Sequence, residues 1–195
     1  MQLRIKCRGA VALCIFSLLL INCGGDTPRS QDGGALLAHT PRALAPGTTQ
    51  DWTGLRVVPI ASALNVTKTS AVEIRMNNAA DLYALHLFLE FDPELLRVQD
   101  LNPELEGVQI APGVLPAPDF TVRNQADNEH GMIEYAVTQL NPRKPAQGDG
   151  VVAVIRFEGV GPGISALRFS YAKLSNPDGR EMPVQIVDAT LEVDY

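Results

Sequence analysis

The chain has 195 residues, of which 46% are hydrophobic, 6% aromatic and 19% charged. This length holds one domain, or a domain with an extended segment, and the composition is that of a globular protein rather than a multi-span membrane protein. The formal net charge is −6. An acidic chain without a basic cluster repels phosphate backbones, so we expect no nucleic-acid partner.

The first 22 residues have the pattern of an export signal. Arg4, Lys6 and Arg8 precede residues 10–21, which are apolar except for Ser17. This stretch is about half of the roughly 20 residues that a membrane-spanning helix needs, which favours a signal peptide over a permanent anchor. Residues 20–23 then resemble a lipobox, in which the Cys becomes the lipidated first residue of the mature protein.

Residues 1–22 are therefore predicted to be a lipoprotein signal peptide and Cys23 the lipidation site. Asn22 departs from the Gly, Ala or Ser that normally precedes the Cys of a lipobox. Ordinary secretion and an uncleaved anchor are the alternatives. We expect an exported protein, attached to the membrane by its N-terminal lipid and facing outside the cytoplasmic membrane.

Residues 23–54 contain Gly, Pro, Thr, Ser and Gln with scattered charges, and one brief apolar patch at 35–38. Such a segment cannot bury enough apolar surface to offset its conformational entropy, so we predict a flexible linker. Cys23 would be the only thiol after cleavage, since Cys7 and Cys14 precede it. The domain that follows must be stable without an internal disulfide.

Residues 55–195 show the rhythm of an all-β domain. In residues 83–91, Leu85, Leu87 and Leu89 alternate with His86 and Phe88, which predicts a strand with one buried face. Similar patterns occur at residues 72–77, 132–138, 151–157, 164–169 and 186–193. Eight to ten short strands without a long helical segment predict a β-sandwich.

Turn signals separate these segments. Asn77-Asn78, residues 127–131 and residues 148–150 are predicted turns because Asn, Asp and Gly tolerate the conformations that turns require. Prolines at 112, 116 and 118 predict a long loop that crosses between sheets, as Greek-key and jelly-roll topologies require.

Four segments, in order and spacing, resemble cohesin domains. The strands at 72–78 and 82–91 are followed by the motif DPELLRV at 92–98, and residues 131–133, 150–157 and 163–167 resemble later blocks of the family. The similarity covers essentially all of residues 55–195. It implies a jelly-roll β-sandwich of about nine strands that is not an enzyme, binds dockerin modules of polysaccharide-degrading enzymes and is related in fold to carbohydrate-binding modules.

The resemblance also implies where the partner binds. In cohesins, the outward face of the strand before Asp-Pro receives the dockerin, and its positions here are Ala84, His86, Phe88 and Glu90. Gln139 falls near a later position that is often an acidic contact. Ala84 and His86 replace the Asn and Asp of many cohesins, so we expect a more apolar contact centred on Phe88.

Signals for catalysis and metal binding are weak. The sequence has no Gly-x-Ser-x-Gly or His-Glu-x-x-His motif, and residues 127–131 are more typical of a hairpin turn than of a metal loop. We therefore expect no catalytic residue, no metal and no cofactor. Most aromatic residues of the domain are predicted to lie in the core, with Phe88 as the exception, which leaves no flat platform for a sugar.

We therefore expect an exported binding module whose partner is a dockerin-like protein or a polysaccharide, with a role in polysaccharide breakdown at the cell surface. One alternative is a carbohydrate-binding module that binds a glycan directly. Another is a structural subunit of a secretion or surface complex.

Overall fold

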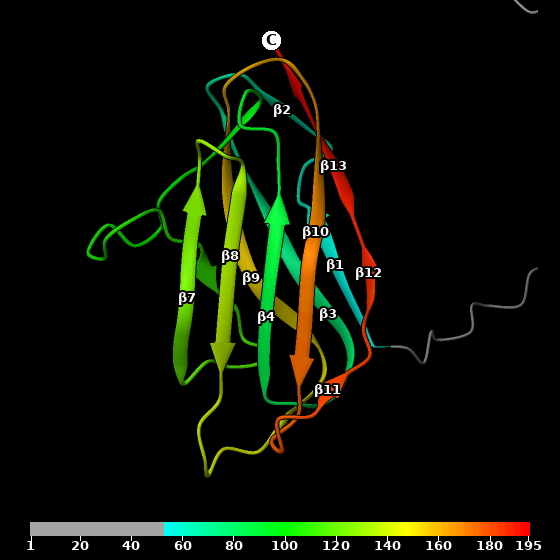
Figure 1. Ribbon diagram of the computed structural model, residues 1–195. Helices are drawn as coiled ribbons and strands as arrows, with labels where there is room; N and C mark the ends of the chain where they lie inside the picture. Colours follow the sequence, from blue (N-terminus) through cyan, green and yellow to red (C-terminus); the bar gives the residue numbers. More distant parts are fainter. Residues whose placement is uncertain (1–52) are drawn as a thin grey trace, which may run out of the picture. The chain divides into compact units, whose positions relative to one another are not determined.

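The computed structural model describes residues 53–195, which form strands but no helix (Figure 1). This range therefore contains no helix that could span a membrane. The predicted signal peptide, the lipidation site Cys23 and most of the predicted linker lie outside the described residues. The predicted all-β sandwich is confirmed.

Eight strands have six or more residues and five have two or three, where the sequence predicted about nine. The long strands are β1 (Gly54–Pro59), β3 (Thr69–Leu82), β4 (Ala84–Glu90), β7 (Phe120–Asp127), β8 (Met132–Thr138), β9 (Ala146–Gly159), β10 (Gly163–Ser175) and β13 (Ala189–Asp194). The short strands are β2 (Ala63–Asn65), β5 (Leu96–Val98), β6 (Ala111–Pro112), β11 (Glu181–Met182) and β12 (Gln185–Val187).

The strands form two sheets. The first has the order β12-β1-β3-β9-β5, with β6 also paired to β9. The second has the order β2-β13-β10-β4-β8-β7, with β11 also paired to β10. Most neighbours are antiparallel, but β12 pairs with β1 and β13 pairs with β2 in parallel. The chain changes sheets at Asp188, between β12 and β13, where the Asp188 carboxylate accepts a hydrogen bond from the Phe169 N–H at 3.0 Å.

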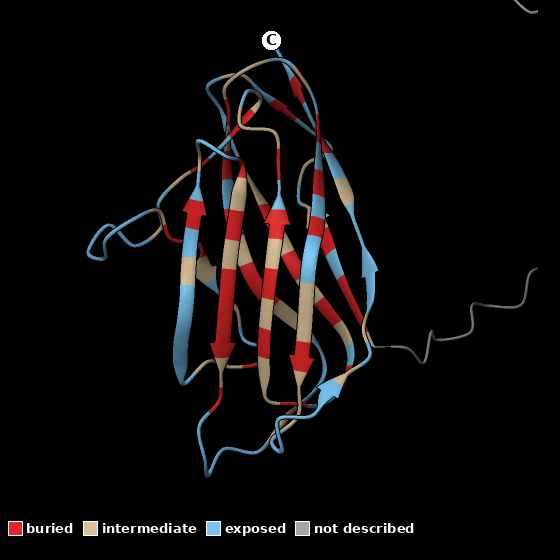
Figure 2. Cartoon of the chain, viewed as in Figure 1, coloured by how far each residue is buried: buried red, intermediate tan, exposed pale blue. Residues whose placement is uncertain are grey.

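The core lies between the sheets and is built from alternating residues of their strands. Leu85, Leu87 and Leu89 of β4 are buried, as predicted, while the residues between them are more exposed. Figure 2 shows this alternation along β4. Ile74 of β3 and Phe157 of β9 are fully buried in the opposing sheet. One face of β4 therefore packs in the core, and the other face lies on the outer surface of the sheet.

Two predicted turns are wrong, because Asn77-Asn78 lies within β3 and residues 148–150 lie within β9. These strands pair with register shifts there, and Asn78 and Gly148 have φ angles of 49° and 85°. Asn and Gly tolerate left-handed backbone, which occurs in β-bulges as well as in turns. Their presence here therefore indicates an irregular strand rather than a reversal of the chain.

The predicted crossing loop is confirmed, since residues 113–119 connect β6 in one sheet to β7 in the other. Gly113 is required there because a Cβ atom would lie 2.1 Å from the Val151 carbonyl oxygen. Strand β7 itself was not predicted. Ala126 is its one buried residue, so it lacks the alternation that reveals a strand.

Candidate functional site

The candidate site is the outer face of β4 together with its neighbours. Strands β8 and β10 flank β4, and β7 lies beyond β8 at the edge of the sheet (Figure 1). The strand register places outward residues in four rows, which we call the docking face. Each row is given in the order β7, β8, β4, β10, starting from the Ala84 end. The first row contains Phe120, Thr138, Ala84 and Ser175, and the second contains Arg123, Ala136, His86 and Lys173. The third row contains Gln125, Glu134, Phe88 and Tyr171, and the fourth contains Asp127, Met132, Glu90 and Arg168.

The structure brings four of the five predicted partner-binding residues together. Ala84, His86 and Phe88 are half-buried on the docking face, and Glu90 is exposed at its end. Gln139 does not lie on this face, because its side chain is only 3% exposed and odd-numbered residues at the end of β8 point inward. The surface therefore excludes Gln139 and is defined by strand register.

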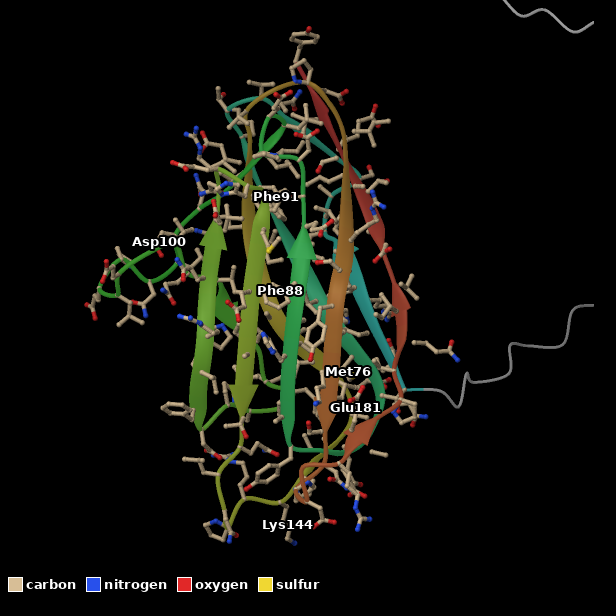
Figure 3. The ribbon with its side chains drawn as sticks, viewed as in Figure 1. Met76, Phe88, Phe91, Asp100, Lys144 and Glu181 are labelled. Carbon is tan, nitrogen blue, oxygen red and sulfur yellow. The ribbon has the colours of Figure 1, made fainter. Side chains whose placement is uncertain are left out.

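Three aromatic rings meet at the centre of the docking face. The His86 ring centroid lies 5.1 Å from that of Phe88 and 5.2 Å from that of Tyr171, and the Phe88 and Tyr171 centroids are 5.8 Å apart. The interplanar angles are 48°, 70° and 64°. Phe88 lies about midway along the sheet in Figure 3. We call these three tilted rings the aromatic cluster.

Tyr171 is the member of the aromatic cluster that the sequence analysis did not identify. Leu167 and Phe169 are buried, so strict alternation would bury Tyr171 as well. The pairing of β10 with β4 instead shifts between Phe169 and Tyr171, which leaves Ser170 as an extra residue. As a result Tyr171 points outward, is 41% exposed and pairs directly with Phe88.

Glu134 links the aromatic cluster to charged neighbours. Its Oε1 atom lies 3.1 Å from the Nε2 atom of His86, and its Oε2 atom lies 3.6 Å from the Nε atom of Arg123. These groups are partly exposed, so the pairs orient side chains more than they stabilise the fold. Neither Glu134 nor Arg123 was predicted, because only the register of β7, β8 and β4 shows that they lie beside His86.

Two shallow hollows lie on the docking face. The apolar hollow, of about 210 Å³, is lined by Ala84, Leu85, His86, Val122, Ala136, Val137, Thr138, Lys173 and Ser175. The acidic hollow, of about 400 Å³, is lined by Phe88, Gln125, Asp127, His130, Met132 and Glu134. The hollows lie at opposite ends of the face, on either side of the contact between His86 and Glu134.

Asp127 closes the predicted hairpin turn and borders the acidic hollow. Its Oδ1 atom accepts the N–H groups of Glu129 and His130 at 2.9 and 3.0 Å, and its Oδ2 atom lies 2.8 Å from the Nδ1 atom of His130. The His130 N–H and the imidazole ring hold the pKa of Asp127 below its usual value, and the Asp127 carboxylate raises the pKa of His130. The predicted turn at 127–131 is thus confirmed.

The docking face combines aromatic and charged side chains. Residues 53–195 contain no group of three His, Cys, Asp or Glu side chains that could hold a metal ion. The aromatic cluster supplies an apolar centre, while Arg123, Lys173, Glu90 and Asp127 supply a mixed-charge border. Such an apolar centre with a polar rim is typical of protein-binding surfaces.

The sequence matches no protein-family model and gives no significant match among curated proteins. Solved structures are similar in fold. A type II cohesin domain from the cellulosome of Acetivibrio cellulolyticus superposes with a TM-score of 0.62 at 16% identity, covering 72% of this chain and 95% of that one. A non-cellulosomal cohesin from Archaeoglobus fulgidus gives 0.58 at 18% identity, covering 74% and 92%.

A type I cohesin–dockerin complex from Clostridium thermocellum also superposes, with a TM-score of 0.58 at 17% identity, covering 72% of this chain and 99% of that one. The domain therefore has the cohesin fold, as the resemblance of its sequence implied. The similarity extends over nearly the full length of each of these cohesin chains.

Proposed function

We propose that residues 55–195 are a non-catalytic binding module that docks a dockerin-type protein partner on the docking face. The observation that carries this proposal is the cluster of His86, Phe88 and Tyr171, which lies partly exposed on the outer face of one sheet. Aromatic residues surrounded by a polar border supply most of the binding energy in many protein interfaces.

The structural neighbours support a protein partner. Several of them are cohesins crystallised with dockerins, among them complexes from Acetivibrio cellulolyticus and Clostridium thermocellum. The polar border of the docking face carries both signs, with Arg123, Lys173 and Arg168 against Glu134, Glu90 and Asp127. A mixed border selects partners by complementary charge rather than by net charge alone.

The geometry favours a protein over a glycan. A sugar-binding platform stacks rings against the flat faces of consecutive sugars, whereas the three rings here are tilted by 48° to 70° from one another. A tilted cluster suits the insertion of a partner's side chains. Direct binding of a polysaccharide is the alternative, and the same experiment distinguishes it.

The test is capture from the native extracellular fraction with and without a calcium chelator, using the protein with a photo-crosslinking residue at Glu90. The matched control carries the crosslinker at Arg56, which is exposed on the opposite sheet. We expect a calcium-dependent protein that crosslinks from position 90 and not from position 56, because dockerins need calcium to fold. Calcium-independent capture of a polysaccharide, or crosslinking only from position 56, would reject the proposal.

We further propose that the module is exported and attached to the cell envelope through lipidated Cys23. This rests on the basic and apolar segments that precede the Cys. Replacing Cys23 by Ser is expected to move the protein from the membrane fraction to the soluble extracellular or periplasmic fraction. Fatty-acid labelling of the natural chain and of this variant checks the result, and an unlabelled natural chain would contradict it.

A further inference from the structure

We infer that the free edge of β7 is a self-association surface, on which a second copy of this chain adds its own β7 in antiparallel orientation. Strand β7 lies at the end of its sheet, so β8 pairs with only one of its sides. An edge strand directs alternate N–H and C=O groups away from its neighbour, and these groups pair with a further strand where nothing covers them. This surface is the side of a strand and differs from the docking face, which is the outer face of the sheet.

Residues 108–110 cover one half of this edge. The Ala126 N–H donates a hydrogen bond to the Val108 carbonyl at 2.8 Å. The Asn124 side chain exchanges two hydrogen bonds with the backbone of Ile110, at 2.9 and 2.7 Å. Among the described residues, no strand or bridge pairs with the other half of the edge. We call this half the open edge, and it consists of Phe120, Thr121, Val122 and Arg123.

The open edge carries two large apolar side chains. Phe120 is 55% exposed and Val122 is 57% exposed. Phe120 belongs to the first row of the docking face and Val122 lines the apolar hollow, so both side chains lie on the same side of the sheet. A charged residue in the middle of an edge strand hinders pairing, but the one charge of the open edge, Arg123, lies at its end. Exposed apolar side chains beside unpaired backbone groups favour association.

The open edge is self-complementary, which favours a second copy as its occupant. In an antiparallel pair centred on Thr121, symmetry places Phe120 of each copy opposite Val122 of the other. Opposed aromatic and β-branched side chains stabilise a pair of strands. Arg123 then lies opposite Asp119 of the second copy, which already binds an arginine of its own chain, so no like charges meet. The bulge at Val122 increases the local twist, and an identical strand carries the same twist.

A groove beside β7 leaves room for the added strand. The groove has a volume of about 330 Å³ and is lined by residues 121–125 of β7 and by Leu105, Glu106 and Gln109 of a projecting loop. The Asp100 carboxylate holds the base of this loop by accepting two backbone N–H groups at 3.0 Å each (Figure 3). The strand of the second copy would enter this groove beside Leu105, which is an exposed apolar residue.

Pairing at the open edge would join the β10-β4-β8-β7 sheets of two copies into one sheet. The two-fold axis of an antiparallel pair is perpendicular to the sheet, so the docking faces of both copies would lie on the same side. The dimer would present two binding surfaces together to a partner with two modules. This consequence rests on the proposed docking function, whereas the pairing itself does not. The interface is short, so the dimer should be weak and dependent on concentration.

Sedimentation velocity of the full chain tests the pairing. A reducing agent is present, so that Cys7, Cys14 and Cys23 cannot link chains. The natural chain should pass reversibly from monomer to dimer between about 10 µM and about 1 mM. Val122→Lys places a charge in the middle of the open edge and should raise the dissociation constant of the dimer at least about tenfold. Ile164→Lys is the matched control, because Ile164 is exposed on β10, which is separated from β7 by β4 and β8, and it should leave this constant unchanged.

Thr121→Cys tests the register of the pair. Directly opposed residues of antiparallel strands have Cα atoms about 4.5 to 5.5 Å apart, which is within the range of a disulfide. Oxidation of this variant should give a covalent dimer. Arg56→Cys, at an exposed position on the opposite sheet, should give no more covalent dimer than the natural chain with its own three cysteines.

Three results would each overturn the inference. The first is a chain that stays monomeric at about 1 mM, which includes the case in which a different protein occupies the open edge. The second is a dimer that Val122→Lys and Ile164→Lys weaken equally. The third is a dimer in which Thr121→Cys crosslinks no better than Arg56→Cys. Circular dichroism checks that Val122→Lys is folded, and the crosslink decides the question if it is not. The capture experiment at Glu90 is independent of these results.

Discussion

Leu87→Asp is expected to unfold the domain or to lower its free energy of unfolding by at least about 4 kcal/mol. Leu87 is fully buried between the sheets, so the substitution both opens a cavity and places an unpaired carboxylate in an apolar interior. Domains of this size are stable by only about 5–15 kcal/mol, so the loss would remove much of the total. Urea unfolding followed by circular dichroism measures it.

Glu90→Gln is the matched control on the same strand, because Glu90 is exposed at the end of the outward face. It should change the free energy of unfolding by less than about 0.5 kcal/mol. Leu87→Ala separates the two causes, since it creates the cavity without the charge and should cost about 2–5 kcal/mol. Similar midpoints for Leu87→Asp and Glu90→Gln would show that the two faces of β4 have been assigned the wrong way round.

Phe88→Ala is expected to weaken binding of the captured partner by about 1–3 kcal/mol while leaving the domain folded. The ring is half-buried and contacts only the other two members of the aromatic cluster among the aromatic residues described. Its removal therefore deletes the centre of the docking face without opening the core. Calorimetric titration against the purified partner measures the change.

Tyr171→Phe keeps the third ring of the aromatic cluster and should bind within about 0.5 kcal/mol of the natural protein. Unchanged binding by both Phe88→Ala and His86→Ala, together with loss of binding on changes to residues 112–118, would place the site at the loop end of the sandwich. The docking face would then be wrong as the site.

The sequence was most informative where one strand alone determines the outcome. Alternation along residues 83–91 correctly separated the buried leucines from His86 and Phe88, because a strand presents successive side chains to opposite faces. The motif at 92–98 ends β4 and leads into β5, and the chain turns there through hydrogen bonds from the N–H groups of Leu95 and Leu96 to the Asp92 carbonyl.

What the sequence could not show depends on relations between strands. Tyr171 is exposed because one extra residue, Ser170, shifts the pairing of β10 with β4, and a bulge leaves no mark in the alternation on either side of it. Glu134 and Arg123 belong to the site through the registers of β8 and β7. Gln139 was assigned to the surface by counting along a family pattern, where a shift of one residue exchanges the faces of a strand.

The parallel pairings at the edges of both sheets join the beginning of the domain to its end. Strand β1 pairs with β12 through Gly54 and Gln185, and β2 pairs with β13 through Ala63 and Glu192. Contacts between residues so distant in the chain form slowly, because a long loop must close before they contribute. Neither sheet can be completed until β12 and β13 have left the ribosome, so the order of synthesis itself keeps the domain from finishing its fold early.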